Sequence, residues 1–164
     1  MKMEPRISIV TLGVTDLDRA VAFYEAMGLE RHEKFTEGVA FFQMGGVILA
    51  LWPREELARD AGLPYRSAPG KAITTKHPGQ AVPFQLPEQE FSGVALAYNT
   101  RTPEEVLEIL RRAEKAGGRV LKQAGRAFWG GVQGYFEDTE GNLWEVAFNP
   151  DFSIDEEGRI SLPA

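Results

Sequence analysis

The chain has no cysteine, and histidine occurs only twice in its 164 residues. Without cysteine there is no disulfide, no thiol nucleophile and no thiolate ligand for a metal. No apolar run approaches the roughly 18 to 20 residues that a membrane-spanning helix needs, and the first residues lack the apolar core of a signal peptide. We therefore expect a cytoplasmic protein with no membrane partner.

The charge balance is acidic, with 18 basic and 24 acidic side chains and a formal net charge of −6. Lysine and arginine do not cluster along any segment, so neither nucleic acid nor an anionic membrane surface is an expected partner. A length of 164 residues suits one compact domain, or two small modules that share a core.

One pattern of secondary structure occurs twice along the chain. The first copy, predicted over about 6–52, starts with a strand at Ile7–Val14 and continues with an amphipathic helix over Leu17–Met27. Thr15 is the expected N-cap, and Gly28 supplies the left-handed residue that ends the helix. Two strands joined as a hairpin are predicted to follow at 39–44 and 47–52, with 29–35 as a candidate for one more.

The second copy, predicted over about 91–150, repeats this order with a better defined helix. Thr102 is its expected N-cap, Pro103 occupies its first position, and Glu105 completes a capping box. Three strands are predicted to follow at 119–122, 133–137 and 142–148. Repetition of one supersecondary unit indicates that the two copies pack together to bury their apolar faces.

The segment 53–90 between the copies is rich in proline and glycine, and its one regular feature is a short predicted helix at 55–61. A connection of this length inside a compact domain is either a functional flap or a mobile loop, and the sequence leaves both open. The tail, 151–164, is polar and acidic and is expected to lie on the surface or to be disordered.

Two stretches resemble one known family. Val10–Leu29, VTLGVTDLDRAVAFYEAMGL, and Tyr135–Val146, YFEDTEGNLWEV, are similar to the vicinal oxygen chelate superfamily of glyoxalase I, bleomycin resistance proteins and extradiol dioxygenases. Trp129–Phe136 and Trp144–Pro150 resemble, more narrowly, uncharacterised members. The resemblance implies an α+β fold in which two tandem βαβββ modules form curved mixed sheets around a pocket, with 1–164 as a single domain, and it implies a homodimer. It does not imply one function, because that fold serves many.

Enzymes of that superfamily hold a divalent metal with one residue from each of four strands. The resemblance places these positions at Ile9, Ala50, Val94 and Glu145. Of these side chains only Glu145 can bind a metal, and one carboxylate cannot supply the three or more nitrogen or oxygen ligands that such a site needs. We therefore expect no metal and no other cofactor.

The two histidines do not change this expectation. His32 follows the first helix, His77 lies in the linker, and both are expected to be solvated, although a closing flap could carry His77 inward. Asp16, Tyr24 and Gly28 also match the family pattern, where they are structural.

Glu145 is the candidate catalytic residue. Strand alternation places Leu143, Glu145 and Ala147 on one face and Trp144 and Val146 on the other, where the two apolar side chains should pack against a helix. Glu145 then faces the groove. It either anchors or deprotonates a ligand there, or it is an inherited carboxylate held by a neighbouring arginine, tyrosine or water.

The candidate ligand-binding residues combine aromatic rings with this carboxylate: they are Trp52, Tyr98, Phe128, Trp129, Tyr135 and Glu145. The tryptophans could form a stacking wall for a planar or cationic ligand, and Tyr98 is expected at the rim. Core packing is the favoured account of Phe128. Tyr135 and Phe136 lie on opposite sides of one strand, so one of them must face the groove.

The leading hypothesis is a metal-free protein that sequesters a small organic molecule, cationic ones included, in an aromatic pocket. The alternative is a lyase, isomerase or dioxygenase of the same superfamily, with an atypical metal site or with Glu145 as a base. A third alternative is a structural or partner-binding domain, which an apolar surface patch without a pocket would favour.

Overall fold

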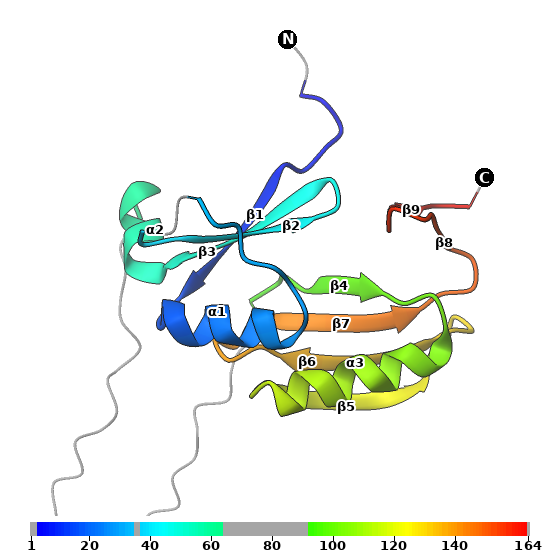
Figure 1. The fold of residues 1–164 in the computed structure, drawn as a ribbon. Coiled ribbons are helices and arrows are strands. Elements are labelled where there is room, and N and C mark those ends of the chain that lie inside the picture. Colours follow the sequence, from blue (N-terminus) through cyan, green and yellow to red (C-terminus); the bar gives the residue numbers. More distant parts are fainter. Residues whose placement is uncertain (1–2, 35–36, 64–91, 164) are drawn as a thin grey trace, which may run out of the picture.

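The computed structural model describes residues 3–34, 37–63 and 92–163, which form an α+β fold with two curved mixed sheets (Figure 1). The first sheet has the strand order β1-β3-β2. β1 (Ile9–Val14) runs parallel to β3 (Val47–Pro53), and β2 (Ala40–Met44) pairs with β3 in the antiparallel sense. The predicted hairpin between β2 and β3 is therefore confirmed.

The second sheet has the strand order β4-β7-β6-β5. β4 (Leu96–Asn99) is parallel to β7 (Leu143–Phe148), while β6 (Val132–Glu137) is antiparallel to both β7 and β5 (Arg119–Arg126). Each sheet thus contains one parallel pair formed by its opening strand and its last strand. The shared arrangement confirms that one unit occurs twice.

The duplication is incomplete in the first copy. The segment that precedes β2 makes only an isolated bridge, between Arg31 and Phe42, where the second copy has the full strand β5. The first copy is therefore βαββ with one bridge, and the second is βαβββ.

The predicted N-cap is correct for one helix and wrong for the other. α3 (Pro103–Lys115) begins with the predicted capping box between Thr102 and Glu105. α1 (Leu17–Ala26) is capped by Asp16, whose side chain accepts a hydrogen bond from the Arg19 amide at 3.0 Å. The prediction of Thr15 as N-cap is wrong, because its amide and hydroxyl both donate to Glu140 in the other module.

α1 ends as the sequence predicts. Gly28 has a φ of +99°, its amide donates to the Glu25 carbonyl at 2.9 Å, and the Leu29 amide donates to the Tyr24 carbonyl at 3.0 Å. This pair of bonds is a Schellman motif, which needs the left-handed residue that glycine supplies. The short helix predicted in the linker is also present, as α2 (Arg54–Asp60).

α1 joins the two sheets into one core. Its Phe23 ring lies 6.2 Å from Phe136 of β6, and its Tyr24 ring lies 5.9 Å from Phe42 of β2 and 6.1 Å from Trp144 of β7. Figure 1 shows α1 and α3 on the same side of the second sheet. The helices therefore cover one face of that sheet and leave the opposite face to other groups.

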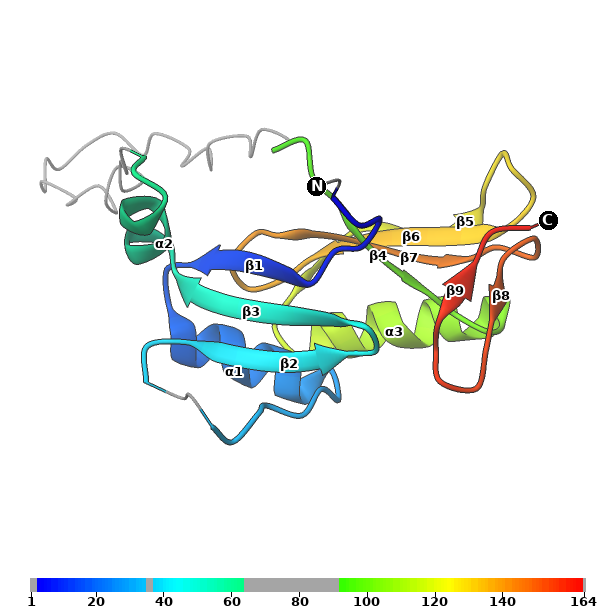
Figure 2. The same cartoon turned by 90° about the horizontal axis from the view of Figure 1, so that it is seen from above.

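The end of the described chain forms a small hairpin rather than an irregular tail. β8 (Ser153–Ile154) pairs with β9 (Ile160–Ser161), and the Arg101 guanidinium donates to the carbonyls of Ile154 and Asp155. Figure 2 shows this hairpin at the end of the molecule where α3 begins. Among the described residues, no helix is long and apolar enough to cross a membrane.

Candidate functional site

A group of polar side chains lies on the face of the second sheet that is turned away from α3. These side chains, which we call the polar sheet face, are Lys122, Gln133, Tyr135 and Glu145. Cross-strand pairing places Tyr135 opposite both Lys122 and Glu145. Their strand neighbours Phe136, Trp144 and Val146 are buried in the core. Glu145 thus lies on the opposite face from Trp144 and Val146, as strand alternation predicts, and Tyr135 rather than Phe136 shares its face. That this face lines a ligand groove stays a prediction.

The Gln133 amide links two opposite charges on this face. With its nitrogen oriented toward the carboxylate, it donates to Glu145 Oε1 at 2.8 Å, and its oxygen accepts from Lys122 Nζ at 2.9 Å. Lys122 Nζ also lies 5.7 Å from the centre of the Tyr135 ring, close to the outer limit of about 6 Å for a cation–π contact. Glu145 is therefore held by neighbours, while it stays partly accessible to solvent.

Tyr135 keeps its proton beside this carboxylate. Burial raises the pKa of the Tyr135 hydroxyl, and the charge of Glu145 and a hydrogen bond to it raise that pKa further. In such a pair the carboxylate can accept a hydrogen bond from a ligand, and the phenol hydroxyl is the group that can donate one. This pairing suits a ligand hydroxyl or ammonium group.

Two members of this face were not among the sequence candidates. Lys122 and Gln133 carry no motif, but Gln133 lies two residues before Tyr135 on β6, and Lys122 of β5 pairs directly with Tyr135. The strand β5 extends to Arg126, beyond its predicted end at residue 122, and is irregular between Lys122 and Gly125. That irregularity prevents a simple alternation argument from assigning the face of Lys122.

Of the side chains at the four metal positions of the family, only that of Glu145 offers a ligand atom. Thr11 of β1 pairs with Ala50, and Ala97 of β4 pairs with Glu145. Thr11 and Ala97 are therefore equivalent positions in the two modules. Ile9 is then equivalent to Ala95, and the prediction of Val94 is wrong. This correction leaves the chemistry unchanged, because alanine also offers no ligand atom. Within residues 3–34, 37–63 and 92–163, no group of three or more histidine, cysteine, aspartate or glutamate side chains could hold a metal ion.

The predicted tryptophans do not surround Glu145 in the described part of the chain. Trp52 shares the outer face of the first sheet with Ala50 and donates from its indole to Glu56 at 3.2 Å. Trp129 lies in the turn between β5 and β6, where a Cβ added at Gly131 would meet its ring at 1.9 Å. Both remain candidate ligand-binding residues on the strength of the sequence alone.

Phe128 and Tyr98 lie elsewhere than predicted. Phe128 is fully exposed in the turn between β5 and β6, so the expectation that it packs in the core is wrong. Tyr98 is offset by one residue from Ala97, which pairs with Glu145, and its ring lines a cavity on the helix side of the sheet. Tyr98 therefore does not share the face of Glu145. Of the two histidines, His32 is exposed as expected, whereas His77 lies outside the described residues.

The acidic turn that carries the family resemblance is structural. Asp138 accepts hydrogen bonds from the Glu140 amide at 2.9 Å, the Asn142 amide at 2.8 Å and the Tyr24 hydroxyl at 2.7 Å. The Trp144 indole donates to the same Tyr24 hydroxyl at 3.1 Å. The turn thus holds the start of β7, and with it the position of Glu145.

Glu140 ties this turn to the first module. Its side chain is 1% exposed, forms an ion pair with Arg19 and accepts from the Thr15 amide and hydroxyl, each at 2.6 Å. Burial alone would raise the pKa of Glu140, but the bonds from Thr15 and the Arg19 guanidinium outweigh it and lower that pKa below its usual value. The carboxylate is therefore a charged link between the modules.

Comparison with solved structures gives relatives of the same architecture. A glyoxalase-related enzyme from Fulvimarina pelagi is 31% identical, with 98% of this chain and 100% of that chain covered and a TM-score of 0.77. Lactoylglutathione lyase from Agrobacterium tumefaciens is 25% identical, with 90% and 96% covered and a TM-score of 0.58.

A more distant structure shows the fold alone. It is a glyoxalase/bleomycin resistance protein/dioxygenase family enzyme from Burkholderia phytofirmans PsJN, 17% identical, with 86% of this chain and 96% of that chain covered and a TM-score of 0.63. No curated protein is similar enough to match. The family model described as Glyoxalase/Bleomycin resistance protein/Dioxygenase superfamily matches residues 6–146, and the chain therefore belongs to that superfamily.

Proposed function

We propose that this protein binds a small organic molecule on the polar sheet face, with Glu145 as the anchor and without a divalent metal. The observation that carries the proposal is the state of Glu145. It is the one acidic side chain among the four family positions, and Gln133 and Tyr135 hold it in place. The other three positions, Ile9, Ala50 and Ala95, carry aliphatic side chains and leave Glu145 without partners for a metal.

The chemistry of this face indicates what the ligand carries. Glu145 accepts hydrogen bonds, the Tyr135 hydroxyl donates, and Lys122 adds a positive charge at the edge. A ligand with a hydroxyl or ammonium group next to Glu145 would replace or extend the bond from Gln133.

An enzyme is the second candidate, and the contact between Tyr135 and Glu145 favours it. A carboxylate base beside a protonated phenol can remove a proton from carbon and protonate a neighbouring oxygen, which is the chemistry of an isomerase. The similarity to a protein called lactoylglutathione lyase also supports an enzyme. A cytoplasmic location and a homodimer stay predictions from the sequence and the family.

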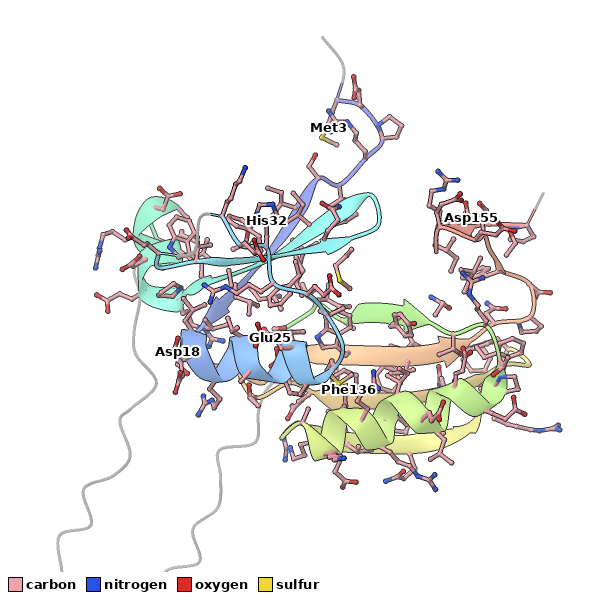
Figure 3. The ribbon with its side chains drawn as sticks, viewed as in Figure 1. Met3, Asp18, Glu25, His32, Phe136 and Asp155 are labelled. Atoms are coloured by element: carbon pink, nitrogen blue, oxygen red, sulfur yellow. The ribbon has the colours of Figure 1, made fainter. Side chains whose placement is uncertain are left out.

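The test is a thermal-shift screen of the purified protein against cationic aromatic and hydroxyl-bearing compounds, followed by titration calorimetry of each hit. Glu145→Gln keeps the shape of the side chain and removes its charge, and it should weaken a true ligand about tenfold or more. Glu25→Gln is the matched control, because Glu25 is exposed on α1 (Figure 3).

The two candidates give different results in this test. Lost affinity with no product formed supports a binding protein. Unchanged affinity with lost turnover supports an enzyme that uses Glu145 as a base. Equal binding of every hit by the parent protein and Glu145→Gln, with no turnover in either, would contradict both.

A further inference from the structure

A cavity of about 290 Å³ lies between α1 and α3, on the side of the second sheet opposite to Glu145. Its walls include the core rings of Phe23, Phe136 and Trp144, and Figure 3 shows Phe136 between the two helices. The Phe136 and Trp144 rings are stacked, with their centroids 6.2 Å apart and an interplanar angle of 1°. We call this space the helix-side cavity.

The mouth of the helix-side cavity is apolar and uncovered. Tyr98 lines this cavity, on the face of the sheet opposite to Glu145, and is 46% exposed. Met27, Leu29 and Met44 complete the rim with partly buried side chains. Methionine adapts its shape to what it contacts, so this rim can close around a small body.

One positive charge is fixed at this rim. Arg112 Nη1 donates to the Met27 carbonyl at 3.2 Å and lies 3.0 Å from where a Cβ at Gly28 would be. A side chain at residue 28 would therefore crowd the guanidinium. The contact with Met27 holds Arg112 against the end of α1, at the edge of the cavity.

The guanidinium of Arg112 has donors to spare. Within the described ranges it forms no ion pair, and its Nε and Nη2 make no hydrogen bond. Glu108 lies one turn earlier on α3, at the spacing of a favourable helical ion pair, yet Arg112 turns to the Met27 carbonyl instead. An anion at the rim would receive two directed hydrogen bonds as well as the charge.

We propose that the helix-side cavity is a second ligand site, which binds a small carboxylate whose body is one aromatic ring or a branched aliphatic chain. The size supports a single ring, because an apolar cavity of about 150 Å³ already takes up benzene. The remaining volume holds the carboxylate, which contacts Arg112, while the ring lies against Phe136 and Trp144. This site is independent of the polar sheet face.

Phenylacetate is a probe of this class, and phenylacetamide is its neutral analogue of the same shape. In NMR titrations of the full chain, phenylacetate should shift signals of Met27, Met44 and Trp144 and bind about tenfold more tightly than phenylacetamide. Arg112→Gln should weaken phenylacetate about tenfold and leave phenylacetamide unchanged. Met44→Trp should fill the cavity and weaken both compounds.

Arg111→Gln is the matched control, because Arg111 is the neighbouring arginine on α3, is exposed and does not line the cavity. It should bind both probes like the parent protein. Circular dichroism melting of each variant confirms that it is folded. The proposal is overturned if phenylacetate shows no saturable binding, if Arg112→Gln binds it as well as the parent does, or if Glu145→Gln weakens it, since that would place the probe on the polar sheet face.

Discussion

The outer faces of the two sheets differ in charge although their strands follow the same order. In the first sheet the face away from α1 carries uncharged side chains, those of Ile9, Thr11, Phe41, Gln43, Ile48 and Ala50, whereas the second sheet carries the charged Lys122 and Glu145 of the polar sheet face. Ala50 corresponds to Glu145 in the two hairpins. The difference teaches that duplication preserved the backbone and the core while each copy's outer face changed on its own.

The cores show why the backbone could persist. Leu49 and Leu51 in β3 and Trp144 and Val146 in β7 all point toward helices and are buried. These inward positions are constrained by packing, because a change of volume there creates a cavity or a clash. Ala50 and Glu145 lie on the opposite faces of these strands, where Glu145 is partly exposed and Ala50 is buried.

The largest effect should follow from giving the first sheet the carboxylate of the second. Ala50→Glu places a charge at a side chain that is 2% exposed, where no described neighbour corresponds to Gln133. We expect a loss of about 3 to 5 kcal/mol in the free energy of unfolding at neutral pH, measured by urea denaturation. The reverse change, Glu145→Ala, should cost less than about 1 kcal/mol, because Glu145 is partly exposed and can give up its neighbours to water.

Ala50→Gln separates charge from size in that comparison. Burial raises the pKa of a carboxyl group, so the cost of Ala50→Glu should shrink as the pH falls below that raised pKa, while the cost of Ala50→Gln stays constant. Equal costs for the two variants at every pH would show that the first sheet tolerates a charge at this position.

A middle-sized effect concerns the turns of the two hairpins. The first turn, at Gly45, carries no side chain, whereas Glu140 in the second turn bonds to Thr15 and Arg19. Glu140→Gln should cost about 1 to 3 kcal/mol at pH 7, because it removes the charge from buried hydrogen bonds. The matched control, Glu156→Gln, changes an exposed residue and should cost nothing measurable.

The pH dependence gives Glu140→Gln a second readout. The pKa of Glu140 is lower in the folded protein than in the unfolded chain, so its contribution is fully present above the unfolded pKa of about 4.3. That contribution is lost as the pH falls through the folded pKa. The parent protein should therefore lose more stability on acidification than Glu140→Gln, and parallel curves for the two proteins would refute the charged link.

The smallest effect is spectroscopic. The pKa of Tyr135 is raised by burial first and by Glu145 second, so Glu145→Gln should lower it toward the ordinary value without restoring that value fully. NMR titration of the Tyr135 ring measures this shift directly. An unchanged pKa would mean that Glu145 does not contact the hydroxyl, and the polar sheet face would lose its acid–base pair.

Local patterns in the sequence predict most of the fold. The capping box at Thr102, the glycine after α1 and the turn before β7 each specify their element through a few neighbouring residues. The fate of Thr15 could not be predicted in this way, since its partner Glu140 lies 125 residues away in the chain. In the first module, the segment between α1 and β2 forms only a bridge at Arg31 instead of a strand. This outcome likewise depends on tertiary pairing.

The site was predictable in part for the same reason. Strand alternation correctly predicts that Glu145 lies on the face opposite to Trp144 and Val146, because β7 pairs regularly along its whole length. The same alternation argument placed Tyr98 on the wrong face. The predicted alignment of the two opening strands was one residue off, and Ala97 rather than Tyr98 shares the face of Glu145. Gln133 and Lys122 became candidates only through their cross-strand contacts, which no single segment encodes.

The central claim is that Glu145 acts without a metal because the other family positions have lost their ligands. Elemental analysis of the purified, tag-free protein tests it most directly, after incubation with Zn, Ni, Mn and Fe(II) and removal of loosely bound ions. The account predicts far less than one metal ion per chain, and the same content in Glu145→Gln. Near-stoichiometric metal that disappears in Glu145→Gln would contradict it and would identify Glu145 as a metal ligand.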